Sequence, residues 1–98
     1  MLISTVDAVP FEYITNIGSN NISVIDTATN TIVTNVSIGS VPSGVAVSPD
    51  GLKVYVPNWD SDNVSVIDTV TNTVEPTAIL VGIFPEGVAS LQMEKQYM

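Results

Sequence analysis

Short stretches of β-branched and aromatic residues alternate along the chain with turns built from Gly, Asn, Asp and Pro. Val, Ile, Thr and Tyr favour extended backbone, whereas the turn residues favour tight bends. No useful length shows the 3.6-residue apolar spacing of an amphipathic helix. The pattern predicts strands over residues 12–17, 21–26, 31–38, 45–48, 52–56, 63–68 and 73–80. The sequence therefore predicts an all-β fold.

Both faces of the central strands are largely apolar. In an extended strand, Val64 and Val66 point to one side of the sheet while Ser65 and Ile67 point to the other. Leaving about six large apolar side chains in water forgoes ~10 kcal/mol, which is on the scale of a whole domain's stability. We therefore expect each sheet to be sandwiched between neighbours, as the blades of a β-propeller are.

The chain contains one stretch twice. Asn21 to Thr27 reads Asn-Ile-Ser-Val-Ile-Asp-Thr, and Asn63 to Thr69 differs from it only by Val in place of Ile. With a shift of 42 positions, residues 13–38 match 55–80, and a one-residue slip then matches 39–46 with 82–89. A period of about 40–45 residues is typical of a four-stranded propeller blade.

Several motifs, in their order and spacing, resemble the YVTN β-propeller repeat of archaeal surface-layer proteins and related bacterial proteins. They are Tyr13-Ile14-Thr15-Asn16, Tyr55-Val56-Pro57-Asn58, Asn63 to Thr69, and Gly44-Val45-Ala46-Val47-Ser48-Pro49-Asp50-Gly51. Pro57 departs from the family by standing at its Thr position. The resemblance covers roughly residues 11–89. It implies that residues 44–48 form the innermost strand of a blade, 52–58 the second, 63–69 the third and 73–81 the outermost.

The repeat divides the chain into four parts. Residues 1–10 are an irregular lead-in or the remnant of a signal peptide, and the two readings fit equally well. Residues 11–43 are a first blade without an innermost strand, and residues 44–86 are a complete second blade. Residues 87–98 begin a third innermost strand and continue as a divergent tail.

The tail suggests a truncated gene. After Ala89 the repeat predicts Val-Ser-Pro-Asp-Gly, but residues 90–98 read differently. One choice of codons for these residues restores the repeat when a single lost base is put back. We therefore hypothesise that the chain is a frameshifted piece of a longer propeller, which the codons of the gene will test.

Two blades do not close a ring, because propellers typically have four to eight. Chains assembled head to tail, each lending residues 87–91 to the first blade of the next, would close a ring from three or four copies. We therefore expect a homo-oligomer that closes a propeller ring, or protein and cell-surface partners, or completion by missing sequence.

Composition narrows the chemistry. The chain has no Cys and no His, and its two basic residues are Lys53 and Lys95, so it has no Arg. This removes disulfides, thiolate and imidazole metal ligands, and the usual general base. Ten acidic residues give a net charge of −8, which argues against nucleic acid and anionic membranes as partners. No apolar run reaches the ~18–20 residues of a membrane span.

Three Asn-X-Ser sequences offer candidate glycosylation sites at Asn21, Asn35 and Asn63. The competing interpretation is that Asn and Ser simply suit strand starts near turns. No residue pattern identifies a catalytic, cofactor-binding or metal site, and we expect no cofactor.

Acidic and aromatic residues near the strand ends allow further interpretations. Asp60 and Asp62, with Asn58 and Asn63, offer oxygens to Ca²⁺, although a solvated acidic turn fits their spacing better. Trp59 offers a partner-binding aromatic ring, although packing over a blade edge is favoured. Asp26 and Asp68 occupy matching positions of the repeat, which favours turn capping over acid catalysis.

The sequence thus predicts a non-catalytic β-propeller module at a cell surface, which binds or packs against partners. The alternative is a piece of the scaffold of a propeller enzyme, because lactonases and quinoprotein dehydrogenases resemble this architecture. A third possibility is a truncated chain without a selected function.

Overall fold

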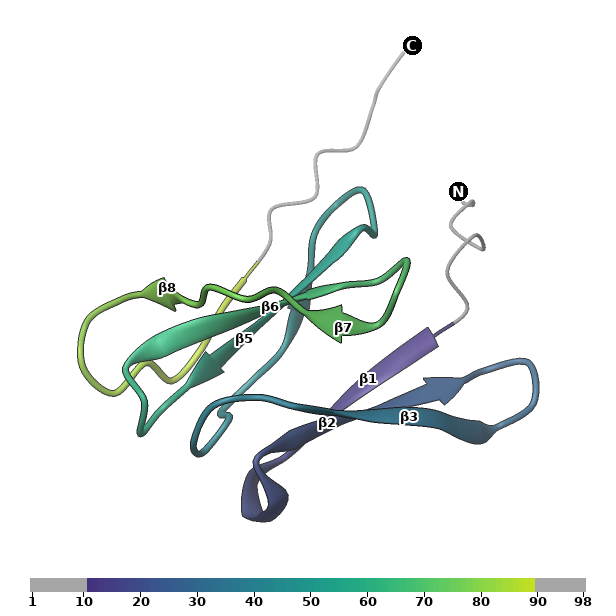
Figure 1. Ribbon diagram of the computed structural model, residues 1–98, viewed down its shortest axis with the longest axis horizontal. Helices are drawn as coiled ribbons and strands as arrows, with labels where there is room; N and C mark the ends of the chain where they lie inside the picture. Colours follow the sequence, from purple (N-terminus) through teal and green to yellow (C-terminus); the bar gives the residue numbers. More distant parts are fainter. Residues whose placement is uncertain (1–10, 90–98) are drawn as a thin grey trace, which may run out of the picture.

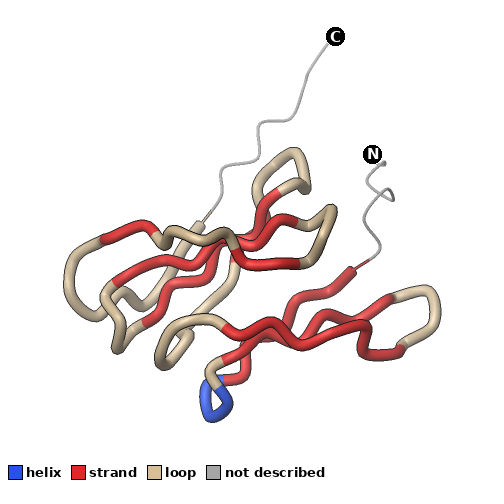
Figure 2. Tube along the Cα trace, in the orientation of Figure 1, coloured by secondary structure: helices blue, strands red, loops and turns tan. Residues whose placement is uncertain are grey.

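The alternating residues of the two repeats fold into two antiparallel sheets that lie one against the other in the computed structural model, which describes residues 11–89 (Figure 1). The first sheet contains β1 (Phe11–Asn16), β2 (Asn21–Asp26) and β3 (Thr31–Ser37). The second contains β4 (Ala46–Val47), β5 (Lys53–Asn58), β6 (Asn63–Asp68), β7 (Thr73–Val74) and β8 (Ile79–Leu80). A 3₁₀ turn, η2 (Ile17–Ser19), joins β1 to β2 (Figure 2).

The first sheet is a simple meander in the order β1-β2-β3. Tyr13 lies opposite Val24, and Ile22 lies opposite Val36, so these four side chains share one face. Between Val24 and Ile25 the β2–β3 register shifts, which is the mark of a β-bulge. The repeat predicts that this blade lacks an innermost strand. The described part of the first sheet accordingly contains β1, β2 and β3 alone.

The second sheet has the predicted strand order, from β4 through β5 and β6 to the outer edge. The predicted outermost strand 73–80 is wrong as one element, because it is divided into β7 and β8, both of which pair with β6. Pro76 lies between them and lacks the N–H that a ladder needs. Its position at the sheet edge is the one that the sequence predicts. Pro57, in contrast, stays within β5 opposite Val64.

The turns repeat as closely as the strands. Within residues 11–89, six residues other than Gly have positive φ, and they form three pairs under the sequence repeat: Asn20 with Asp62, Asn30 with Asn72, and Val41 with Phe84. Asn and Asp tolerate left-handed backbone because their side chains bond nearby amides. Val41 and Phe84 have no such compensation of their own. The matched strain at unrelated residue types shows that both repeats impose the same chain path.

The core lies between the sheets. Tyr13, Ile22, Val24 and Val36 of the first sheet meet Val54, Val56 and Ile67 of the second in one buried cluster. Phe11, Ile38 and Val45 pack against its border. On the outer face of β6, Val66 is also only 5% exposed. In the first sheet only the face toward the second sheet is buried.

Several predicted ends shift by a residue, and one predicted strand is not formed. The first strand begins at Phe11 and ends at Asn16, before the η2 turn. Residues 87–89, expected to start a third innermost strand, have no strand pairing among the described residues. The lead-in 1–10 and the divergent tail 90–98 lie outside the described residues.

Gly39 marks the closest approach between the first blade and the second. A Cβ atom placed on Gly39 would lie 2.8 Å from both Cγ and Nδ2 of Asn58, and 3.0 Å from Oγ of Ser61. Asn58 is fully buried, and its amide donates hydrogen bonds to Asn63 and Ser65. The neighbouring side chain therefore cannot move aside without losing those bonds.

We expect Gly39→Ala to destabilise the chain by about 1–3 kcal/mol, the usual cost of overpacking a buried contact. Gly18→Ala is the matched control, because a Cβ atom there meets nothing within 4 Å. Its effect should stay within about 0.5 kcal/mol. Urea unfolding followed by Trp59 fluorescence measures both. Equal effects of the two substitutions would contradict the close packing at Gly39.

Candidate functional site

The polar residues that recur in both repeats form the same small network at the end of each blade. Asn58 Nδ2 donates to Asn63 Oδ1 and to Ser65 Oγ, both at 2.9 Å. The matching network in the first blade joins Asn16 to Asn21 at 2.9 Å and to Ser23 at 2.8 Å. Asn58 is buried between the sheets, whereas Asn16 is half-buried on the outer face of the first sheet.

Asp26 and Asp68 cap identical turns. Asp26 Oδ1 accepts a hydrogen bond from the backbone N–H of Ala28, and Asp68 Oδ1 accepts one from Val70, both at 2.8 Å. The backbone carbonyls of the two Asp residues also accept from Asn30 and Asn72 at 2.7 Å. The predicted capping role is therefore confirmed.

The three candidate glycosylation residues all lie in strands. Asn21 and Asn63 are half-buried, and their side-chain oxygens accept the hydrogen bonds of Asn16 and Asn58. Asn35 is exposed on β3, where its Oδ1 accepts a hydrogen bond from Ser23 at 2.7 Å. Asn35 is therefore the most accessible of the three in the folded chain.

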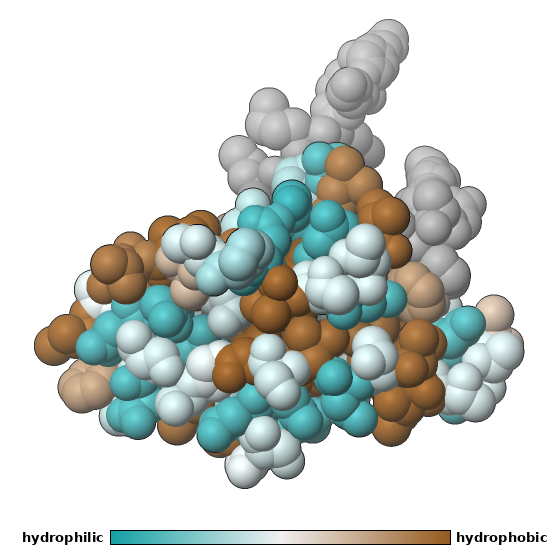
Figure 3. All heavy atoms as spheres, in the orientation of Figure 1, coloured by the Kyte–Doolittle hydropathy of each residue, from teal (hydrophilic) through white to brown (hydrophobic). Residues whose placement is uncertain are grey.

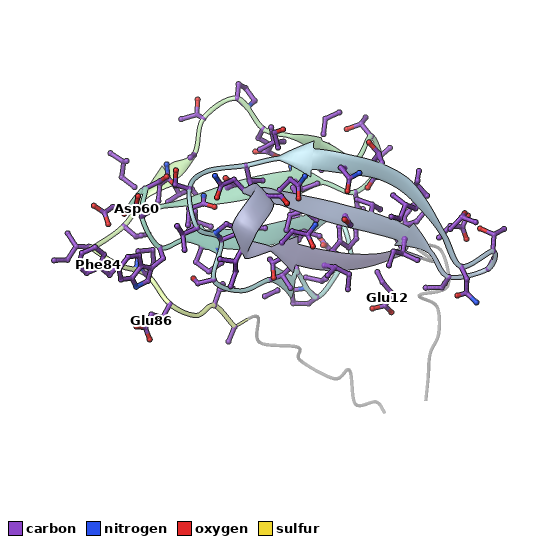
Figure 4. The ribbon with its side chains drawn as sticks, turned by 90° about the horizontal axis from the view of Figure 1, so that it is seen from below. Glu12, Asp60, Phe84 and Glu86 are labelled. Atoms are coloured by element: carbon purple, nitrogen blue, oxygen red, sulfur yellow. The ribbon has the colours of Figure 1, made fainter. Side chains whose placement is uncertain are left out.

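The acidic loop considered for Ca²⁺ is held by a contact with a later segment of the same blade. Asp62 Oδ1 accepts a hydrogen bond from the N–H of Phe84 at 2.9 Å. Asp60 is exposed and lies near Phe84 in Figure 4. Trp59 stacks on Phe84 with ring centroids 4.3 Å apart and planes 14° from parallel. The aromatic ring thus packs over the edge of its own blade, as the sequence favours.

Charged side chains form one ion pair in the described part of the chain. Lys53 pairs with Glu75 near Asp68, and the Glu75 hydrogen bond raises the pKa of the Lys53 amine. Hydrogen bonds from Ser48 and from the N–H of Leu52 lower the pKa of Asp50 in the turn before β5. Both sets of contacts shape turns and strand edges. Residues 11–89 contain no cluster of three acidic side chains suited to a metal ion.

Polar contacts between the two blades accompany the apolar core. The hydroxyl of Tyr13 donates to Oδ1 of Asn72 at 2.7 Å, joining β1 to the turn before β7. At the end of the first blade, the N–H of Ser40 donates to Ser61 Oγ at 2.8 Å, and the carbonyl of Val41 accepts from the N–H of Trp59 at 2.7 Å. This set of blade-to-blade contacts could not be recognised from the sequence, although its residues repeat.

Large apolar side chains are exposed at both ends of the pair of sheets. Ile14 (44% exposed) and Ile17 lie at the first sheet, while Leu80 and Ile83 (75% exposed) lie beyond the second. Figure 3 shows apolar residues gathered at the side of the molecule where β8 and the segment after it lie. In the described part of the chain, no helix has the length and apolar character required to cross a membrane.

No protein-family model matches the chain. A 37-residue stretch, 38% of the chain, is 60% identical to the PE-PGRS family protein PE_PGRS18 of Mycobacterium tuberculosis (strain ATCC 25618 / H37Rv) and covers 8% of that protein. The sequence similarity is therefore local, and about one blade in length.

Solved structures match over most of the chain. Hydrazine synthase of Kuenenia stuttgartiensis gives a TM-score of 0.77 with 31% identity, covering 82% of this chain and 22% of that one. Apo AztD from Citrobacter koseri gives 0.72 with 20% identity, covering 90% and 24%. Dihydro-heme d1 dehydrogenase NirN, solved in complex with DHE, gives 0.73 with 20% identity, covering 85% and 19%. These proteins are β-propellers, so the two sheets are propeller blades. The chain spans less than a quarter of each of the three.

The Tyr13 contact generates a prediction about pH. Burial, and secondarily the negative charge of Asp68, raise the pKa of the Tyr13 hydroxyl. The unfolded chain therefore loses this proton first, at about pH 10. The stability that depends on neutral Tyr13 is complete below that pH and falls as the pH rises above it.

We expect Tyr13→Phe to cost about 1 kcal/mol at pH 7 and to flatten the loss of stability above about pH 10. Tyr55→Phe is the matched control in dilute solution, because the Tyr55 hydroxyl makes no hydrogen bond among the described residues. Urea titrations between pH 7 and about pH 11 give both quantities. An alkaline slope unchanged by Tyr13→Phe would contradict the argument.

Proposed function

We propose that the chain is a non-catalytic β-propeller module that packs against protein or cell-surface partners, outside the cell, in the manner of the YVTN surface-layer repeats that it resembles. The supporting observation is that the recurring polar residues hold the blades themselves together. Asn58 and Asn16 bind strand ends, and Asp26 and Asp68 cap turns. Each of these groups is thus engaged in a contact within the chain itself.

The charge of the chain agrees with such a role. Ten acidic residues against two lysines leave the surface strongly negative, while the contacts between blades are almost entirely uncharged. Repulsion between acidic surfaces keeps a protein soluble at high local concentration, and apolar blade faces still provide cohesion. A structural module that repeats at a surface benefits from this separation.

A surface role predicts that the chain is reachable from outside intact cells. We expect an antibody against residues 11–89 to label unpermeabilised cells, and external protease to remove that label. The matched measurement is the same labelling after permeabilisation, with a cytoplasmic protein as a marker of leakage. Labelling that appears only after permeabilisation would contradict the surface role and leave the blade fold unaffected.

The alternative is a piece of an enzyme scaffold. It is favoured by the names of two similar structures, a hydrazine synthase and a dehydrogenase. We expect the chain alone to show neither lactone hydrolysis nor quinone-dependent alcohol oxidation above the buffer blank, with Ca²⁺ supplied. The chain unfolded in urea and then refolded is the control for contaminating enzymes. Activity that follows the folded protein through purification would favour the scaffold interpretation.

A further inference from the structure

The two outer faces of this pair of sheets correspond, under the sequence repeat, to the two faces that are buried against each other at its centre. The outer face of the first sheet matches, under the repeat, the face of the second sheet that is buried against the first. Ile14 corresponds to Val56, which is fully buried, and Ile25 corresponds to Ile67, which is also fully buried. The segment after the second blade likewise matches the segment that follows the first.

The hydrogen bonds that join the blades recur at these ends as unpaired halves. Tyr13 and Asn72 form a bond across the central interface, and their counterparts are Tyr55 and Asn30. Among residues 11–89, the Tyr55 hydroxyl makes no hydrogen bond, and the side-chain amide of Asn30 makes none either. Asn30 already has the left-handed backbone of Asn72, with φ of 57° against 55°.

A second pair of halves lies in the loops. The N–H of Ser40 donates to Ser61 Oγ at the centre, and the corresponding residues are Ile83 and Ser19. Both side chains are exposed, Ser19 in the η2 turn of the first sheet and Ile83 in the segment that follows β8. Phe84 repeats the positive φ of Val41, 54° against 56°, so the two segments share this left-handed residue.

Steric fit and charge point the same way. Gly39 packs against Asn58, whereas its counterpart Gly82 has nothing within 4 Å of a Cβ position. Under the repeat, the open space beside Gly82 corresponds to the position that Asn58 fills at Gly39, and the counterpart of Asn58 is Asn16. Where the central interface has Phe11 and Val54, the outer faces have Lys53 and Glu12, which carry opposite charges, and Lys53 is also paired with Glu75 of its own sheet. In Figure 4 Glu12 lies far from Asp60, Phe84 and Glu86, at the other end of the view.

We propose that a second copy of this chain stacks head to tail on the first, with its β1–β3 face against the β4–β8 sheet and with residues 82–86 of one chain seated on the η2 turn of the next. The interface repeats the central one, with Tyr55 bonded to Asn30, Ile83 to Ser19, Gly82 against Asn16, and Lys53 beside Glu12. Both halves of each contact are present on one chain, and the two faces that meet carry opposite charges at Lys53 and Glu12. Such contacts are heterologous, so a ring closes when the blade count permits it.

A disulfide test exploits the absence of Cys from the chain. We mix two single variants, Ser19→Cys and Ile83→Cys, under mild oxidation and separate the products on a non-reducing gel. Stacking predicts that the mixed 19–83 dimer far exceeds its statistical share of about half, because only that pair meets across the interface. A statistical mixture, or no dimer at the highest soluble concentration, would overturn the proposal.

The central interface supplies the geometric reference. Ser40→Cys/Ser61→Cys is the corresponding pair within one chain, and it should form an intrachain disulfide. The double variant Ser19→Cys/Ile83→Cys should then give covalently closed species whose mass reports the number of chains in the ring.

A steric variant decides the matter where the reference disulfide does not form. We expect Gly82→Asn to weaken association about tenfold or more, since its Cβ would meet Asn16 of the next chain. Gly18→Asn is the control: a Cβ atom at Gly18 meets nothing within 4 Å, and its counterpart Asp60 keeps an exposed side chain although its N–H donates to the carbonyl of Ser40 at the central interface. Light scattering across a dilution series reads both, with far-ultraviolet circular dichroism to verify folding. A monomeric parent chain, or equal association of the two variants, overturns the stacking.

Discussion

A sheet whose two faces are both apolar must be covered on both, and this requirement shapes the molecule from its sequence to its ends. One sheet alone would leave Ile22, Val24, Val54 and Ile67 in water, at roughly 1.5–3 kcal/mol for each side chain. Stacking removes all four from solvent at once. The same requirement then reappears at the two outer faces, because each stacked sheet has a second side. A repeat built in this way has no natural end other than closure.

The polar part of the interface makes this stacking specific. Apolar contacts alone tolerate sliding of one sheet over another, whereas a buried amide has fixed directions for its hydrogen bonds. Asn58 is held by Asn63 and Ser65 from its own blade, and Gly39 of the other blade fits directly against it. Its Oδ1 is buried without a hydrogen-bond partner among the described residues. The site therefore penalises any register that places a side chain where Gly39 packs.

Most of the blade could be predicted from the sequence, because the signals are local. The 42-residue repeat predicts the strand order, and the matching positions of Asp26 and Asp68 predict the turns that they cap. The division of the outer strand at Pro76 could also have been predicted from the sequence, since Pro cannot donate a hydrogen bond to a ladder. The left-handed backbone at Val41 and Phe84 was not, because neither residue favours it. The contact between Tyr13 and Asn72 depends on how two sheets sit in space, which no local pattern encodes.

Repeat arrays that stop usually end in a face that differs from their interior. Solenoids, for example, carry terminal caps with polar outer surfaces, because an uncapped apolar face would aggregate. The described outer faces of this chain have no such cap. Ile14 is aliphatic, like its buried counterpart Val56 in the second sheet, and the segment from Leu80 to Phe84 is apolar. The opposite charges of Glu12 and Lys53 are the exception, and they restrict which surface can approach. Ends that keep the residue types of an interior, and add charges that match each other, have the properties of surfaces meant to be covered by the same fold.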